Sequence, residues 1–302
     1  MAKKKKIKIN GDFFIDVFVY AFATFVFVVT LYPFLNVLAI SFNESSDTVR
    51  GGIYVWPRIF TLQNYEKLFD YPNIPRAAVN SVVRTVLGTV LGLFFTSITA
   101  YAVSRKDYIF RKPIMVLFLV AMYVNGGLIP GYLLIRSIGL MNSFWVYIIP
   151  GLIGIFNVIL MRSFMDTLPL SLQESAMLDG ASDFYIYSRI IMPLSLPSIA
   201  TIALFLSVGH WNDWFTAYLY NSRRPENTLL QYELQKVIAD TFAQQAPPPD
   251  ATSDIMRQKM ADVTPKSIQM AIMIVVTTPI LMVYPFIQKY FIKGMLIGSL
   301  KG

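Results

Sequence analysis

Long apolar segments constrain the fold of this chain more than any other feature of its sequence. The first of them runs from Val17 to Phe42 without a charged side chain. A helix of about 20 apolar residues crosses the hydrocarbon core of a bilayer and satisfies its own backbone hydrogen bonds there. We therefore expect an all-α polytopic membrane protein with six transmembrane helices, at about residues 13–42, 79–104, 113–135, 137–161, 190–220 and 267–288.

The overall composition is that of a membrane protein and excludes several other classes. Charged residues make up 15% of the 302 residues, whereas an average soluble domain has about 25%. The chain has no cysteine and a single histidine, His210, so it lacks disulfides and the usual ligands of a metal site. Its net charge of +8 is not accompanied by the mixed basic and aromatic clusters of nucleic-acid-binding proteins. No internal repeat divides the sequence, and we expect one domain over residues 1–302.

The placement of basic residues predicts which loops face the cytoplasm, because short cytoplasmic loops are enriched in Lys and Arg. Lysines crowd residues 3–8, and basic side chains outnumber acidic ones in residues 104–112. The loop 162–193 is acidic on balance and is placed inside by its position between the fourth and fifth crossings. We expect both termini to be cytoplasmic, with residues 43–78 and 221–266 outside.

The polar segment between Pro169 and Pro197 has the pattern of two short helices. Ser171 followed by Glu174 forms a capping-box pattern, which predicts a helix that starts there. Gly180 can end that helix in a left-handed conformation without steric cost. The apolar pattern then resumes as the chain approaches the next crossing. The pattern indicates a helix, a glycine break and a second helix.

Several positions of this segment resemble the EAA loop of ABC importer permeases, namely Glu174-Ser175-Ala176, Asp179-Gly180-Ala181, Ile190, Pro193 and Pro197. Ser175 stands where that family usually has alanine. An ordinary amphipathic loop would explain the capping box, but not the later glycine and prolines. In the family, this loop is a cytoplasmic coupling helix that docks into a groove on an ATPase subunit. The resemblance implies an ATPase-coupling set in which the apolar members fill the groove: Leu172, Glu174, Ser175, Ala176, Met177, Leu178, Asp179 and Gly180.

Polar and aromatic residues cluster in the fifth crossing, at Trp211, Asn212 and Asp213. Two interpretations stay open for this cluster. It can be an aromatic belt at the membrane surface, or part of a translocation path where sugars stack on aromatic rings and bond to Asn and Asp. Polar groups inside a membrane usually face a bundle interior or a cavity. Asn125 and Asn157 are weaker candidates for the same path.

The arrangement of crossings and the long last external loop are similar to those of MalG-like carbohydrate-uptake permeases. The stretch Asn125-Gly126-Gly127-Leu128-Ile129-Pro130 is similar to the LplC/YtcP-like branch of the same family. The resemblance implies a multi-pass protein of the bacterial cell membrane that imports an oligosaccharide. Its implied partners are a second, homologous permease in a heterodimer, an ATPase dimer, an extracytoplasmic solute-binding protein and membrane lipid.

The chain cannot hydrolyse ATP alone, because it lacks the G-x-x-x-x-G-K-[ST] loop that holds nucleotide phosphates. We expect it not to be an enzyme and to carry no cofactor, with ATP and Mg²⁺ bound by the partner ATPase. The alternative from another class is a secondary transporter or channel that works without ATP. Such proteins usually carry charges at mid-membrane, whereas the charges within the predicted crossings, such as Arg84 and Asp213, lie close to their ends.

Overall fold

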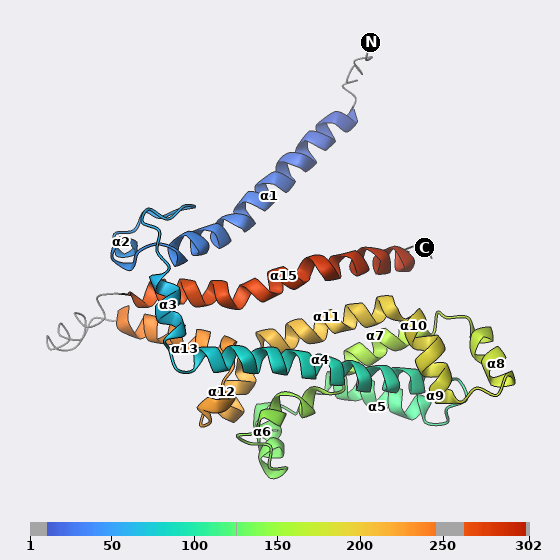
Figure 1. The fold of residues 1–302 in the computed structure, drawn as a ribbon. Coiled ribbons are helices and arrows are strands. Elements are labelled where there is room, and N and C mark those ends of the chain that lie inside the picture. Colours follow the sequence, from blue (N-terminus) through green and yellow to red (C-terminus); the bar gives the residue numbers. More distant parts are fainter. Residues whose placement is uncertain (1–10, 125, 246–262, 300–302) are drawn as a thin grey trace. The chain divides into compact units, whose positions relative to one another are not determined.

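The computed structural model describes residues 11–124, 126–245 and 263–299, and helices dominate all three ranges. Three helices there are long and apolar enough to cross a membrane: α1 (Gly11–Ser41), α4 (Ile74–Ser104) and α15 (Pro265–Ser299). They are drawn in blue, cyan and red in Figure 1. Their positions agree with the first, second and last predicted crossings.

The other three predicted crossings are bent pairs of helical segments rather than continuous helices. In the first pair, α5 (Arg111–Tyr123) and α6 (Leu128–Ser137) meet at a bend of 119°. In the second, the turns η1 (Phe144–Tyr147) and η2 (Ile149–Gly151) meet α7 (Ile155–Met165) at a bend of 44°. In the third, the stretch of α9 (Asp183–Tyr185), η3 (Ile186–Ile191) and α10 (Met192–Leu194) meets α11 (Leu196–Asn212) at a bend of 82°. By length and composition, the described residues contain three spans, or up to six if each pair is one span.

Glycine and proline explain where these segments break. Gly127, directly before α6, has a φ of +85°, a conformation that glycine adopts without steric cost. Pro150 lies in η2 and Pro197 lies in the first turn of α11, where the missing N–H of proline leaves no helical bond unmade. Because the residues on both sides of each break are apolar, hydropathy alone predicts unbroken helices.

Shorter helices complete the described chain: α2 (Ser45–Val49), α3 (Gln63–Phe69), α8 (Leu170–Leu178), α12 (Phe215–Asn221), the turn η4 (Pro225–Asn227) and α13 (Leu230–Gln245). In the segment that carries α2 and α3, the side-chain oxygen of buried Asn43 accepts from the N–H groups of Arg58 and Ile59, at 2.8 and 3.0 Å. This asparagine closes the segment into a small hydrogen-bonded structure. Residues 246–262 of the predicted external loop lie outside the described residues.

Two compact units can be distinguished by their internal contacts. One comprises residues 1–70 and 237–275, and the other comprises residues 71–236 and 276–302. Each unit thus combines parts of the chain that are distant in sequence. The single domain expected over the whole sequence stays a prediction.

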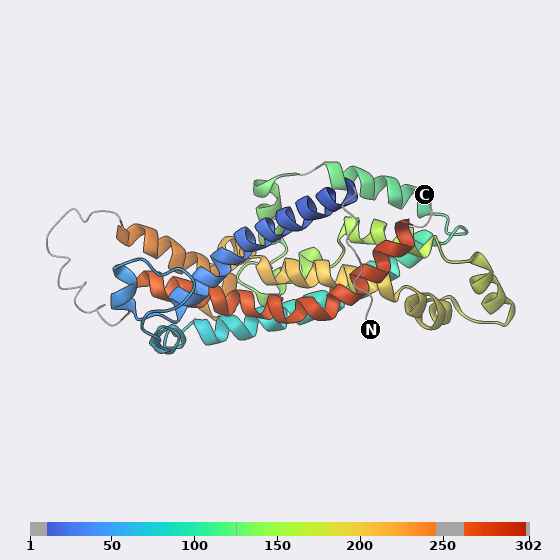
Figure 2. The same ribbon diagram turned by 90° about the horizontal axis from the view of Figure 1, so that it is seen from above.

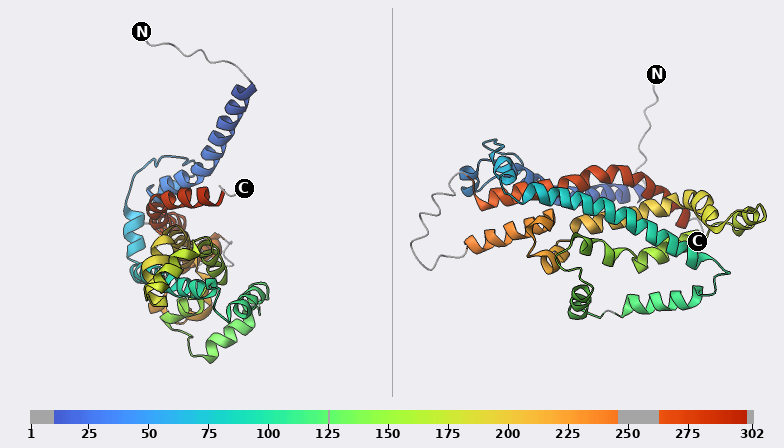
Figure 3. Two further views of the ribbon diagram at one scale, coloured as in Figure 1. Left: turned by 90° about the vertical axis from the view of Figure 1, so that its right-hand side faces the viewer. Right: turned by 60° about the horizontal axis from the view of Figure 1, so that its bottom comes forward.

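The core of the second unit forms where α4 packs along α11 and α7 (Figure 3). Small residues recur on the buried face of α4 every three or four positions or at multiples of that spacing: Ala77, Ser81, Gly88, Gly92, Thr96 and Ala100. A Cβ atom on Gly92 would lie 3.2 Å from Leu206 Cδ1, and one on Gly88 would lie 2.4 Å from His210 Nε2. Glycine at both positions lets α11 approach α4 closely, as small residues do at helix interfaces in membranes.

The segment that resembles an EAA loop forms α8, a tight turn and a second helical stretch that starts with α9. In Figures 1 and 2, α8 projects beyond the neighbouring ends of α4 and α11. Gly180 ends α8 with a φ of +83°, and its N–H donates to the Met177 carbonyl oxygen at 3.0 Å. The Ala181 N–H donates to the Ala176 carbonyl oxygen at 2.9 Å. These two bonds form a Schellman motif, so the predicted left-handed glycine end is confirmed.

The capping box predicted at the start of this helix is wrong. α8 begins at Leu170, with Pro169 as its N-cap residue and without a side-chain hydrogen bond at the cap. Ser171 therefore lies inside the first turn, two positions too late to cap it, and Glu174 lies further along the helix. The reason is that Pro169, with a ψ of 126°, already supplies the non-helical residue from which the helix starts.

Candidate functional site

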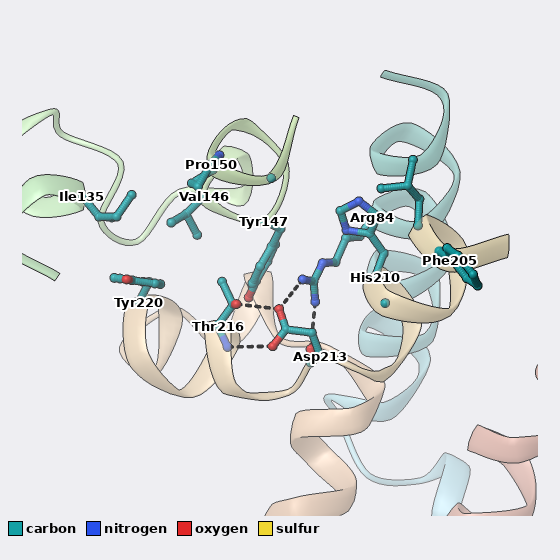
Figure 4. A pocket seen from close by; sticks show the side chains of 13 residues that line it. Arg84, Ile135, Val146, Tyr147, Pro150, Phe205, His210, Asp213, Thr216 and Tyr220 are labelled. Carbon is teal, nitrogen blue, oxygen red and sulfur yellow. Dashed lines mark hydrogen bonds and ion pairs between the residues drawn. The ribbon is translucent and has the colours of Figure 1, made fainter. Parts of the chain in front are cut away.

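A cavity of about 430 Å³ lies beside the break between α11 and α12. Figure 4 shows its walls, which come from α4, α6, the η1 and η2 turns, α11 and α12. Most of the lining is apolar, and a few polar groups converge on it, as in typical small-molecule sites. The polar lining consists of Arg84, Tyr147, His210, Asp213, Thr216 and Tyr220.

An ion pair between Arg84 of α4 and Asp213 forms one wall of this cavity. The guanidinium contacts the Asp213 carboxylate, and Arg84 Nη1 donates to the Asp213 carbonyl oxygen at 2.8 Å. The same carboxylate accepts hydrogen bonds from the backbone N–H and the hydroxyl of Thr216. Only 4% of the Arg84 side chain is exposed. Because an unpaired buried charge is strongly destabilising, the pair holds the break between α11 and α12 against α4.

Aromatic rings complete the polar side of the cavity. The guanidinium of Arg84 lies over the Tyr147 ring, 4.9 Å from its centroid. The Tyr147 hydroxyl donates to the carbonyl oxygen of Asn227 at 2.7 Å, which fixes the ring. Tyr220 of α12 stacks on Tyr132 of α6, with ring centroids 6.0 Å apart. The cavity therefore presents aromatic surface beside carboxylate and hydroxyl oxygens, a combination suited to a ring that carries hydroxyl groups.

Of the residues predicted for a substrate path, Asp213 lies at the cavity. Trp211 is buried, and its indole Nε1 donates to the Val276 carbonyl oxygen at 2.9 Å. The structure thus places the Trp211 ring in helix packing, away from the polar lining. Arg84 and Tyr147 were not among the residues predicted for the path. Arg84 could have been predicted from its charge within the second crossing, because charged side chains in membrane segments usually pair with one another.

Two of the asparagines predicted for the path, Asn212 and Asn157, lie outside the cavity lining. Asn212 is exposed, and its side-chain oxygen accepts from Gln231 Nε2 at 3.2 Å. Asn157 lies on α7 and is absent from the lining of the cavity. Asn125 lies outside the described residues.

A second candidate site surrounds Arg105, which follows the last residue of α4. Its Nη1 donates to Gln173 Oε1 of α8 at 2.9 Å. Its Nε and Nη2 donate to the two carboxylate oxygens of Asp107 at 3.1 and 3.2 Å. The hydrogen bonds with Arg105 hold the pKa of Asp107 below its ordinary value, and the same contact raises the pKa of Arg105. Both groups are therefore charged at neutral pH.

The second helical stretch of the loop has its own attachment to α4. Tyr187 lies in η3, a π-helix, and its hydroxyl shares a hydrogen bond of 2.7 Å with the Ser97 hydroxyl of α4. The Tyr187 ring lies beside Tyr101, with centroids 5.4 Å apart. Single π-helical turns occur often at functional sites. Both helical stretches of the loop are thus attached to the C-terminal part of α4, α8 through Arg105 and η3 through Ser97 and Tyr101.

The predicted ATPase-coupling residues lie largely on the exposed surface of α8 and the turn after it. Leu178 is 89% exposed. Six further members are exposed as well, namely Leu172, Glu174, Ser175, Met177, Asp179 and Gly180. Ala176 is half-buried against the core of the unit. Apolar side chains exposed on a projecting helix are typical of a docking surface.

Membrane-length apolar helices, broken helices around a polar cavity and a projecting loop of short helices together define a membrane transport permease. A family model narrows this class: the binding-protein-dependent transport system inner membrane component matches residues 88–297. The chain belongs to this family. It is therefore a membrane permease subunit of an ABC importer.

Relatives with known descriptions cover nearly the whole chain. The polygalacturonan/rhamnogalacturonan transport system permease protein YtcP of Bacillus subtilis is 38% identical over 95% of this chain and 98% of its own length. Protein LplC of Bacillus subtilis is 38% identical over 91% of this chain and 90% of its own length. The predicted similarity to the LplC/YtcP-like branch is confirmed.

A solved structure has the same fold. It is the crystal structure of a bacterial ABC transporter involved in the import of the acidic polysaccharide alginate. One of its chains matches with a TM-score of 0.85 and 25% identity, over 95% of this chain and 100% of that chain. The all-α fold expected from the sequence is that of an importer permease.

Proposed function

We propose that this chain forms half of the translocation path of an oligosaccharide importer driven by a separate ATPase dimer. A second, homologous permease supplies the other half, and an extracytoplasmic solute-binding protein delivers the sugar. ATP and Mg²⁺ bind to the ATPase, and this chain contributes no catalytic group. The observation that carries the proposal is α8, a projecting helix with exposed apolar side chains and a left-handed glycine end, in a chain of the binding-protein-dependent family.

In this proposal α8 is the coupling helix. ATP binding closes the ATPase dimer, and α8 passes that movement to the membrane helices. The ATPase can shift the permease between states only if its contacts with α8 differ between them. Leu172, Met177 and Leu178 fill the groove on the ATPase, while Gly180 fixes the end of the helix.

The proposed topology has six spans, with both termini and α8 in the cytoplasm of a bacterium and residues 221–266 outside. The excess of basic residues in 104–112 supports this orientation. Each of the three bent pairs then counts as one span. Broken helices inside a membrane are tolerated where they are buried in protein or line a cavity, and all three pairs contribute residues to the lining of the cavity.

The cavity at Arg84 and Asp213 is the part of the path that we assign to the sugar. Arg84 lies 20 positions before Ser104, the end of α4, which is about 30 Å at 1.5 Å per helical residue. In the proposed topology the cavity therefore lies near the outer boundary of the hydrocarbon core. Tyr147 and Tyr220 would stack on sugar rings, and Asp213 would accept hydrogen bonds from hydroxyl groups. The description of YtcP supports fragments of pectic polysaccharides as the substrate class.

Transport by the purified complex tests this proposal. An affinity tag on this chain should bring down a second permease and an ATPase from the native host. In liposomes, uptake of oligogalacturonides should require both ATP and the loaded solute-binding protein. Uptake that follows an ion gradient, with no ATPase in the purified material, would instead identify a secondary transporter.

A further inference from the structure

Polar contacts attach α8 to its unit, alongside the packing of Ala176 against the core. Every residue of α8 is described, and Gln173 is the only one of them that is buried. Leu178 is 89% exposed, and the other two leucines and Met177 are 40–43% exposed, so none of these side chains anchors the helix in the core. A buried amide needs a hydrogen-bond partner. For Gln173 that partner is Arg105, at 2.9 Å between Nη1 and Oε1.

Arg105 contacts several other groups at the same time. Besides its two bonds to Asp107, its Nη1 lies 3.3 Å from the Tyr101 hydroxyl oxygen. Its Nη2 lies 3.6 Å from an Asp183 carboxylate oxygen and 3.8 Å from the Met177 sulfur. Only 11% of the side chain is exposed. One guanidinium therefore joins α8, the start of the second helix of the loop and the end of α4.

The helix α4 connects this guanidinium to the cavity. Arg105 is the C-cap residue of α4, and Arg84 lies 21 positions earlier on the same helix, a separation of about 31 Å at 1.5 Å per residue. No proline interrupts α4 between these two positions. An uninterrupted helix moves as one element, so a displacement of its Arg105 end also displaces Arg84 against Asp213.

We propose that Arg105 is the positioning residue that transmits the movement of α8 to α4, and through α4 to the cavity. This inference rests on the proposed role of α8 as the coupling helix. Arg105 touches neither the ATPase nor the sugar; it keeps α8 and α4 in one fixed geometry. Without Arg105 the ATPase still docks and hydrolyses ATP, but the movement of α8 no longer displaces α4 and the cavity residues on it.

The forked geometry of arginine allows a specific test. Lysine keeps the charge but cannot donate to Gln173 and Asp107 in the same arrangement, so Arg105→Lys should resemble Arg105→Ala. On the other side of the contact, Gln173→Glu keeps an acceptor for Arg105, whereas Gln173→Leu removes it at similar size. Lys106→Ala, at the next position of the chain, is the matched control for loss of a positive charge.

Each variant is compared in the reconstituted complex as sugar imported per ATP hydrolysed. We expect Arg105→Lys, Arg105→Ala and Gln173→Leu to lower this ratio about 5-fold or more, the lower range of coupling between sites. Gln173→Glu and Lys106→Ala should stay near the unmodified protein. Combining Arg105→Ala with Gln173→Leu should lower the ratio no further than Arg105→Ala alone, because Arg105→Ala already removes the contact with Gln173.

An unchanged ratio in Arg105→Lys and Gln173→Leu overturns the inference, and so does a double variant whose loss is the product of the two single losses. If Arg105→Ala fails to assemble, the comparison of Gln173→Leu with Gln173→Glu tests the inference, since only Gln173→Leu should lower the ratio. Leu178→Glu separates this inference from the proposed function, since it should release the ATPase from the purified complex. An ATPase that stays bound contradicts the proposed function. Its release, together with full coupling in the Arg105 variants, contradicts only the inference.

Discussion

At the residue scale, the Arg84–Asp213 ion pair joins α4 to the break between α11 and α12. Both charges can be recognised in the sequence as unusual residues near membrane segments. They are separated by 129 positions, so nothing local indicates that they meet. Packing of α4 on α11 brings them together, and the resulting ion pair makes both charges tolerable in an apolar setting.

Removing one partner of this pair should destabilise the protein more than removing both. Asp213→Asn leaves the buried guanidinium of Arg84 without a counter-charge, a loss of about 3–5 kcal/mol. Adding Arg84→Met removes the second charge and should recover part of that loss. Thermal unfolding of the purified protein measures both effects. Glu226→Gln, which removes the exposed partner of Arg224, is the control and should change the unfolding temperature little. An equal loss of stability in Asp213→Asn and in the double variant would show that Arg84 and Asp213 are not coupled.

At the scale of elements, the sequence predicts continuous helices better than their breaks and ends. The positions of α1, α4 and α15 follow from uninterrupted apolar segments. The bends before α6 and α11 do not, because glycine and proline interrupt segments that remain apolar on both sides. At α8, the glycine end was predictable from a steric argument, whereas the start was assigned to a capping box although Pro169 begins the helix.

Close packing of α4 on α11 predicts a specific cost for one methyl group. Gly88→Ala should lower the unfolding temperature, because its Cβ would lie 2.4 Å from His210 Nε2. Gly209→Ala is the matched control on α11, since nothing lies within 4 Å of an added Cβ, and it should be neutral or stabilising by up to about 1 kcal/mol. Combining Gly88→Ala with His210→Ala should relieve the clash. Similar unfolding temperatures for Gly88→Ala and Gly209→Ala would rule out close contact at Gly88.

The left-handed end of α8 predicts a graded effect on coupling. Gly180→Ala places a side chain at a φ of +83°, which costs about 1–2 kcal/mol. Gly180→Asn should cost less, because asparagine tolerates this conformation. We expect ATP hydrolysis stimulated by the loaded binding protein to fall in the order unmodified, Asn, Ala. If alanine is tolerated as well as asparagine, the end of α8 does not contribute to coupling.

At the scale of the whole molecule, the sequence predicted the class and the family but not the cavity. The family follows from a motif that lies within one short segment. The cavity combines residues from α4, α6, η1, η2, α11 and α12, which are distant in sequence and are brought together by packing. Of the predicted path residues that the structure describes, only Asp213 belongs to it, because the polar cluster in the fifth crossing faces several directions.

The proposed topology predicts the side from which single cysteines react in this cysteine-free chain. Ile109 and Trp56 are 86% and 82% exposed, so cysteines at these positions are accessible to reagents. In intact cells from which any outer barrier has been removed, an impermeant thiol reagent should label Trp56→Cys and spare Ile109→Cys. Permeabilised cells should show labelling of both. Labelling of Ile109→Cys from outside would reverse the orientation.

Crosslinking from α8 tests whether a separate ATPase drives this permease through that helix. A cysteine at Leu178, which is 89% exposed, is coupled to a short photoreactive crosslinker in the assembled, transport-active complex. We predict that the main adduct joins this chain to the ATPase subunit, while a cysteine at exposed Val49 gives none. An active complex in which Leu178→Cys reaches no ATPase would contradict the account.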